Sequence, residues 1–221
     1  MKNKRPEPSV YYPIFLNIQD KKCVVVGGGN VALRKVKMLL RHGPRITVVS
    51  PKPGREMVVL SAKRAIRLIQ RDYRTGDLGD STLAIAATDV GEVNAKVAQE
   101  ARKRGVLVNV TDDPGSSDFI IPSSFRRGAL TVAVSTSGMS PAFAKKIRRR
   151  LERGLGAEYA SLLSLIGEVR SALRKKGYSI HGETWQEALD LDSLLRLIRR
   201  GQGKKAKASL IRKLGRVRSK S

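Results

Sequence analysis

The segment CVVVGGGNVA at residues 23–32 constrains the fold of this chain more than any other feature. Its apolar residues predict a buried β-strand that runs directly into a glycine turn and then into a helix. Gly27 and Gly29, with Ala32 in the third position, fit the pattern G-x-G-x-x-G/A. In that pattern the first glycine makes the tight turn and the second admits a pyrophosphate to the backbone. Because a strand precedes the glycines and a helix follows them, the segment predicts a dinucleotide-binding turn.

Strands and helices alternate along the chain after this turn. The expected elements are a helix ending near 42, a strand at 45–50, a helix at 55–64, strands at 66–70 and 83–87, a helix at 92–104 and a strand at 106–110. Alternation of this kind predicts an α/β fold with a doubly wound parallel sheet of the Rossmann type. We assign it to a first domain at residues 1–114.

The pattern changes after residue 114. Residues 119–125 and 129–135 are expected to form an antiparallel hairpin, and Ser140 and Pro141 begin a basic helix that runs to residue 153. The hairpin and helix predict a small α+β segment at 115–153.

Two further regions complete the predicted organisation. Residues 154–200 carry a periodic series of leucines and predict a helical C-terminal domain. Residues 201–221 contain eight basic residues and no acid, and we expect them to form a flexible basic tail.

The chain is strongly basic, with 44 Lys and Arg against 19 Asp and Glu and a net charge of +25. This charge predicts a polyanionic partner: a nucleic acid, a membrane surface or a substrate with several carboxylates. Charge alone does not choose among them.

The scarcity of cysteine and histidine limits the chemistry. The single cysteine, Cys23, excludes an internal disulfide framework, and His42 and His181 belong to no spaced ligand cluster, so no metal site is expected. The sequence has neither the apolar core of a signal peptide nor an apolar stretch of about 20 residues, so we expect a cytoplasmic protein without a membrane span.

The ends of the second and fourth predicted strands are candidate cofactor contacts. An acid after the second strand selects NAD and a base selects NADP, but here Ser50, Pro51 and Lys52 leave the choice open, and Lys52 leans toward NADP. The fourth strand ends at residues 86–89. In open parallel sheets, ligands bind at the carboxyl ends of the strands. Asn94 lies one helical turn beyond this strand end. Asp89 fits a helix cap equally well.

Asp112 follows the fifth predicted strand and is the candidate catalytic residue. A carboxylate beside a nicotinamide pocket is placed to take or give the proton that accompanies hydride transfer. The alternative is that Asp112 and Asp113 simply make a turn before Pro114, and the pattern alone favours that turn.

Several motifs in order resemble one known family. They are YPIFL at 12–16, VVVGGGNVALRK at 24–35, AATD at 86–89, NVTD at 109–112, FIIPS at 119–123 and VAVSTSGMSP at 132–141. Over residues 11–153 the chain is similar to the precorrin-2 dehydrogenase and sirohydrochlorin ferrochelatase family, which is also found as the N-terminal module of siroheme synthase.

The resemblance implies an activity and a set of site residues. The activity is NAD-dependent oxidation of precorrin-2 to sirohydrochlorin, with Fe²⁺ insertion as a second activity. The aspartate that matters for both reactions corresponds to Asp112, which reverses the preference for a simple turn. Family members lack the acid after the second strand, so its absence does not count against NAD. The implied NAD contacts are Gly28, Gly29, Asn30, Val31, Pro51, Lys52, Ala87, Thr88 and Asn94.

The resemblance also implies partners. It predicts a homodimer formed through the segment at 115–153 and anionic tetrapyrrole substrates rimmed with acetate and propionate groups. The basic residues at 145–150 could guide such a substrate, although a run of charge is more often a solvated face. Thr136 stands where trifunctional members carry a serine that can be phosphorylated, and the methyltransferase domain of those members is not expected here.

Two other functions remain open at the level of the sequence. One is a regulatory module that senses NAD and uses its basic tail on nucleic acid or protein, although a nucleic-acid partner is not expected from the resemblance. The other is a chelatase or porphyrin-transfer protein whose dinucleotide site is vestigial.

Overall fold

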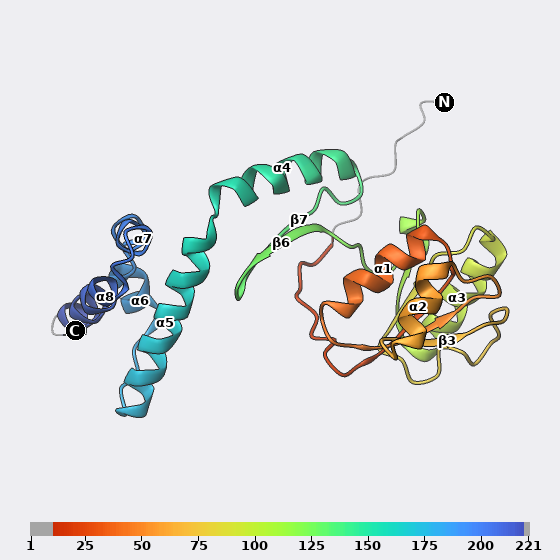
Figure 1. Ribbon diagram of the computed structural model, residues 1–221, viewed down its shortest axis with the longest axis horizontal. Coiled ribbons are helices and arrows are strands. Elements are labelled where there is room, and N and C mark those ends of the chain that lie inside the picture. Colours follow the sequence, from red (N-terminus) through yellow and green to blue (C-terminus); the bar gives the residue numbers. More distant parts are fainter. Residues whose placement is uncertain (1–10, 219–221) are drawn as a thin grey trace. The chain divides into compact units, whose positions relative to one another are not determined.

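A computed structural model describes the backbone of residues 11–218 and the side chains of residues 11–215 (Figure 1). The described residues form two compact units, divided in sequence between Ile121 and Pro122. Within residues 11–218, no helix has both the length and the apolar character needed to cross a bilayer.

The first unit is built on a parallel sheet of five strands in the order β3-β2-β1-β4-β5. The strands are β1 (Lys22–Val26), β2 (Arg45–Val49), β3 (Arg67–Ile69), β4 (Leu83–Ala86) and β5 (Leu107–Val110). The helices are α1 (Asn30–Leu40), α2 (Arg55–Ala62) and α3 (Gly91–Arg104). All neighbouring strands are parallel, which confirms the predicted Rossmann-type fold.

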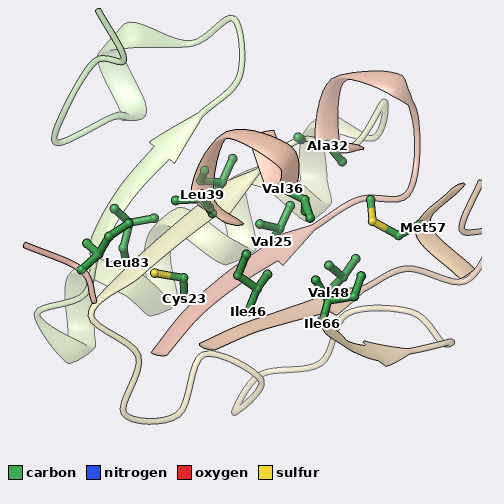
Figure 2. Close-up of a cluster of buried hydrophobic side chains, with 13 residues drawn as sticks. Cys23, Val25, Ala32, Val36, Leu39, Ile46, Val48, Met57, Ile66 and Leu83 are labelled. Atoms are coloured by element: carbon green, nitrogen blue, oxygen red, sulfur yellow. The ribbon is translucent and has the colours of Figure 1, made fainter. Parts of the chain in front are cut away.

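Both faces of this sheet are buried, which explains the continuous apolar run in β1. Cys23 and Val25 face a core formed with α1 and α2, whereas Val24 and Val26 face a core formed with α3. Figure 2 shows side chains of α1 directed at the first of these cores. Burial raises the pKa of the Cys23 thiol to about 11, so this residue behaves as a small hydrophobic side chain.

The first unit extends beyond the predicted boundary at 114 because the chain after β5 turns back onto the sheet. The Asp118 N–H donates to the Val108 carbonyl (2.8 Å), and the Asn109 side chain donates to the Phe119 carbonyl (2.9 Å). Phe119 and Ile121 then pack on the core shared with α1 and α2. This return covers the open edge of β5 and delays the hairpin, whose first strand begins at Ser123 instead of 119.

The second unit begins with the predicted antiparallel hairpin and basic helix. Strands β6 (Ser123–Arg127) and β7 (Leu130–Val134) pair, and both contact α4 (Pro141–Gly154). The Ser140 hydroxyl caps α4 by accepting from the Phe143 N–H (3.2 Å). Arg127 joins the hairpin to α4 through its ion pair with Glu152.

The remainder of the second unit is a small helical bundle. It consists of α5 (Ala157–Lys175), α6 (Gly182–Ala188), α7 (Leu191–Arg199) and α8 (Gly203–Arg218). The prediction that the C-terminal region is helical is therefore confirmed.

The prediction of a flexible tail is wrong for residues 203–218. Ala206, Leu210 and Leu214 recur every four residues along α8 and are buried against α5 and α7. The segment was predicted to be a tail because basic residues dominate its composition, although three apolar residues share one face of the helix. Residues 219–221, which belong to the same predicted tail, lie outside the described residues.

Candidate functional site

The first glycine of the turn is required by its backbone geometry. Gly27 has φ +131°, and a Cβ atom there would lie 2.2 Å from the Ala87 carbonyl oxygen. The Gly27 N–H donates to the Val49 carbonyl (2.9 Å), and the Ala87 N–H donates to the Val26 carbonyl (2.8 Å). The turn is therefore wedged between the ends of β2 and β4, where only glycine fits.

Gly28 and Gly29 have different surroundings. A Cβ atom on Gly28 would lie 2.3 Å from the Ser50 hydroxyl and 2.7 Å from the Lys52 carbonyl oxygen, so this glycine lets the turn pack on the loop after β2. A Cβ atom on Gly29 would meet nothing within 4 Å. The fingerprint marked Gly27 and Gly29 but gave no role to Gly28, which the resemblance supplied.

The space beside Gly29 fits an anionic group. Helix α1 begins there without a side-chain cap or an acidic residue in its first turn. The N–H groups of Asn30, Val31 and Ala32 have no acceptor among the residues that the structure describes. Free amides and the positive end of the helix dipole together favour a phosphate group. The start of α1 is therefore a candidate cradle for the pyrophosphate that the glycine pattern predicts.

Two other predicted cofactor contacts lie after β2. Pro51 and Lys52 are exposed, and the Gly54 N–H donates to the Gly28 carbonyl (3.0 Å), which ties their loop to the glycine turn. Their backbone is consequently held beside the turn, while the Lys52 side chain is free to meet solvent or ligand.

The end of β4 brings Ala87, Thr88 and Asn94 together. The Asn94 amide donates to the Thr88 carbonyl (2.9 Å), and its oxygen accepts from the Thr88 N–H (3.2 Å) and hydroxyl (2.8 Å). Asn94 therefore fixes the loop that carries Thr88. Asp89 is exposed and does not cap α3, whose N-cap residue is Val90, so the capping alternative is wrong.

The two aspartates after β5 have separate roles. Asp113 caps the short 3₁₀ turn at Pro114–Ser116 by accepting from the Ser116 N–H (3.2 Å), and the Ser116 contacts hold the pKa of Asp113 below its usual range. Asp112 adopts a left-handed backbone (φ 62°), is exposed, and has no hydrogen bond or ion pair with any described residue. Asp112 also lies in a turn, which the Asp113 N–H closes onto the Val110 carbonyl (3.3 Å), but the Asp112 carboxylate takes no part in it and is left available.

Thr111 marks the same strand end. Its hydroxyl is buried and has no hydrogen-bond partner within the described residues. A buried hydroxyl without a partner is unusual in a folded protein, and here it adjoins the candidate catalytic residue.

Lys35 was not identified as a site residue from the sequence. It is half-buried on α1, and Lys37, roughly 200° away around the helix axis, forms an ion pair with Glu56 of α2. Lys35 therefore lies on the flank away from α2. Burial and Arg34 lower its pKa, while attraction to Asp112 opposes them, which places Asp112 within electrostatic range. The sequence could have indicated Lys35 through its position around the predicted helix, on a different side from Lys37.

These strand ends share one edge of the sheet. Because the strands are parallel, the residues after β1, β2, β4 and β5 all lie at the carboxyl edge. The order of strands reverses between β1 and β4, and open α/β sheets bind ligands at such a switch point. The sequence-predicted residues of the first unit are thus gathered at one edge. Among residues 11–218, no group of three or more His, Cys, Asp or Glu is arranged to hold a metal ion.

Comparisons with known families agree with this geometry. Residues 14–123 match the family described as "Putative NAD(P)-binding", and residues 127–154 match the "Sirohaem biosynthesis protein central" family. The first match spans the sheet unit and identifies a nicotinamide cofactor, without separating NAD from NADP.

Individual relatives point the same way. The siroheme synthase of Nitrosomonas europaea is 41% identical over 81% of this chain and 38% of its own length. Siroheme synthase 1 of Aeromonas salmonicida is 36% identical over 86% of this chain and 41% of its own length. The chain thus spans about two fifths of these curated relatives.

A solved structure extends the likeness to both units. The precorrin-2 dehydrogenase SirC is 25% identical, with a TM-score of 0.67 over 93% of this chain and 100% of the SirC chain. The resemblance predicted from the motifs is confirmed, and the chain belongs to the family formed by the precorrin-2 dehydrogenases and the N-terminal modules of siroheme synthases.

Proposed function

We propose that this protein oxidises precorrin-2 to sirohydrochlorin with NAD as the hydride acceptor, as a step of siroheme biosynthesis. The observation that carries the proposal is the free Asp112 carboxylate at the same sheet edge as the glycine cradle. The likeness to SirC and to siroheme synthases supports the choice of substrate.

The residues at this edge divide the work of dehydrogenation. The nicotinamide ring supplies the hydride acceptor when the cofactor is bound. Gly29 and the first amides of α1 hold the pyrophosphate, and Thr88, fixed by Asn94, borders the cofactor. As a substrate C–H bond loses its hydride, a proton leaves the macrocycle, and the Asp112 carboxylate accepts it. No second oxidant is needed, because one hydride and one proton complete the two-electron oxidation.

The choice of NAD over NADP is part of the proposal. The loop after β2 lacks the acid that usually binds the ribose hydroxyl, and the resemblance implies that this lack is compatible with NAD. Lys52 is the side chain there that could favour a 2′-phosphate instead, so kcat/KM measured with each cofactor decides the point.

The substrate and assembly proposals rest on the second unit. Helix α4 carries six basic residues, of which Lys145, Lys146, Arg149, Arg150 and Arg153 are exposed, which suits a macrocycle rimmed with carboxylates. Phe143 and Leu151 of α4 are also exposed. A two-stranded hairpin such as β6–β7 is only marginally stable by itself, and within this chain α4 is a short element to pack on it. We propose that a second copy of this chain packs on the hairpin as well. Sedimentation of the purified protein tests the homodimer.

We also propose that the protein inserts Fe²⁺ into sirohydrochlorin. The free Asp112 carboxylate could receive protons that the pyrrole nitrogens lose when ferrous iron, here a substrate, enters the ring. Formation of siroheme above the rate without protein is the test. A cytoplasmic location also belongs to the proposal, because reduced cofactor is reoxidised there.

One assay tests the main proposal. Purified protein is mixed with NAD and precorrin-2, and the absorbances of NADH and sirohydrochlorin are followed together. Equal amounts of the two products support the assignment. If neither product forms, the proposed dehydrogenase function is wrong.

A further inference from the structure

A hollow lies in the helical bundle of the second unit, and none of its lining residues belongs to the sheet of the first unit. It has a volume of about 500 Å³ and is formed by the end of α5, the following loop and α6. Its walls include Arg170, Leu173, Arg174, Tyr178, Ile180 and Trp185. The volume falls in the range of sites that bind small molecules.

The backbone holds the walls of this hollow in place. Helix α5 ends at Lys175, and Gly177 follows its cap residue with φ 78°. The Tyr178 N–H donates to the Leu173 carbonyl (3.0 Å), and the Gly177 N–H donates to the Arg174 carbonyl (3.0 Å). This double closure brings Tyr178 back beside Leu173. Leu173, Ile180 and Trp185 pack on the bundle core, so the apolar floor is anchored.

Arg170 and Arg174 give the hollow its charge. They stand one helical turn apart on α5, and neither guanidinium group has a hydrogen bond or an ion pair among the described side chains. Arg174 lies in the last turn, where the helix dipole favours a cation, but Arg170 does not. Like charges at this spacing weaken a helix slightly, so an anion between them would remove an unfavourable interaction.

The lining specifies the chemistry of a ligand. Two guanidinium forks match carboxylates in a bidentate geometry, and an indole and a phenol ring beside apolar residues suit the flat face of a conjugated ring. We propose that this hollow binds one carboxylate-bearing edge of a tetrapyrrole, as a second site separate from the carboxyl edge of the sheet. The identity of this ligand rests on the proposed function, whereas the site rests on the lining.

Trp185 reports on this site directly, because the chain contains one tryptophan. Uroporphyrin, a stable tetrapyrrole with a carboxylate on every side chain, is titrated into the full-length protein without NAD while tryptophan fluorescence lifetime is recorded. Saturable quenching is expected. The variant Arg170→Gln/Arg174→Gln should bind about tenfold more weakly or worse, because charged hydrogen bonds are lost.

The matched control removes the same charge beside the hollow. Lys175→Gln/Lys176→Gln changes two neighbouring cations that do not line it, and should leave the quenching curve unchanged. Circular dichroism spectra and melting temperatures are measured to check that both double variants are folded. AMP and NADH serve as competing flat anions, and neither should displace uroporphyrin at equal concentration.

Three results would overturn the proposal. They are an absence of saturable quenching, equal weakening in the two double variants, or displacement by AMP as effective as by uroporphyrin itself. Equal weakening would mean general attraction to a basic protein, and displacement by AMP would mean a nucleotide site. Because the titration involves no turnover, a failure of precorrin-2 oxidation would leave this result standing, and the reverse also holds.

Discussion

The side chain of Asn94 holds the Thr88 backbone from both sides: it donates to the Thr88 carbonyl at 2.9 Å and accepts from the Thr88 N–H at 3.2 Å. The pair fixes the loop after β4, which borders the proposed nicotinamide pocket. Asn94 was predicted as a cofactor contact, and its engaged amide suggests that it acts through Thr88.

Replacing Asn94 with Asp keeps the acceptor but removes the donor to the Thr88 carbonyl. We expect this variant to lose about 1 kcal/mol of unfolding free energy and to show a raised KM for the cofactor. Lys96→Ala, on the exposed side of α3, is the control and should change neither quantity. A cofactor KM equal to that of the wild type would show that the Thr88 loop does not affect binding.

Gly27 and Gly29 should respond differently to alanine. At Gly27 the added Cβ would collide with the Ala87 carbonyl at a positive φ, so Gly27→Ala should lose about 3 kcal/mol of unfolding free energy. At Gly29 the Cβ meets no protein atom, so Gly29→Ala should fold normally yet bind the cofactor about tenfold more weakly. Thermal melts and cofactor titrations measure both effects. Normal cofactor affinity in Gly29→Ala would contradict the cradle.

Lys35 offers a test in which stability and activity move in opposite directions. Since folding lowers its pKa, charged Lys35 opposes folding at neutral pH, and the wild type should gain stability as pH rises through that lowered value. Lys35→Met should therefore not lower the melting temperature at neutral pH. It should lower kcat if the ammonium positions the Asp112 carboxylate, and Lys35→Arg should restore part of kcat.

Lys37→Met is the control for that variant. It removes the same charge from the opposite flank of α1, where the partner is Glu56. Equal changes in kcat for the two methionine variants would remove Lys35 from the account.

The packing of α8 on the bundle should weaken as pH falls. The hydrogen bond with Lys213, together with contacts from Ser193, lowers the pKa of Asp190 to about 2. A lowered carboxyl pKa adds stability at neutral pH, which is lost as pH falls from about 4 to 2. Amide exchange in α8 should speed up across that window in the wild type. In Asp190→Asn it should be faster already at neutral pH, and protection equal to wild type would exclude this contribution.

Much of the first unit was predictable because its signals are local. The apolar run of β1, the glycine turn and the alternation of elements specify a buried parallel sheet, and the strand ends then supply the candidate residues. The sequence could not show which of Asp112 and Asp113 has a free carboxylate, since both are aspartates in turns and only the Asp113 side chain accepts a hydrogen bond in the fold.

The misjudged parts depend on contacts distant in sequence. Phe119 and Ile121 have the composition of a strand but belong to the core of the first unit, which moved its end from 114 to 121. In α8, basic residues outnumber the three buried apolar positions, so composition suggested a free tail although packing orders it. The ordering of α8 also weakens the alternative of a sensor that binds nucleic acid through that tail.

Asp112→Asn tests the central claim most directly. Asparagine tolerates the left-handed backbone at φ 62°, so the variant should keep the fold while losing the ionised carboxylate. With precorrin-2 and NAD, we expect wild-type protein to form NADH and sirohydrochlorin in equal amounts, and Asp112→Asn to do so about a hundredfold more slowly with unchanged NAD affinity. Turnover by Asp112→Asn at the wild-type rate would contradict the account.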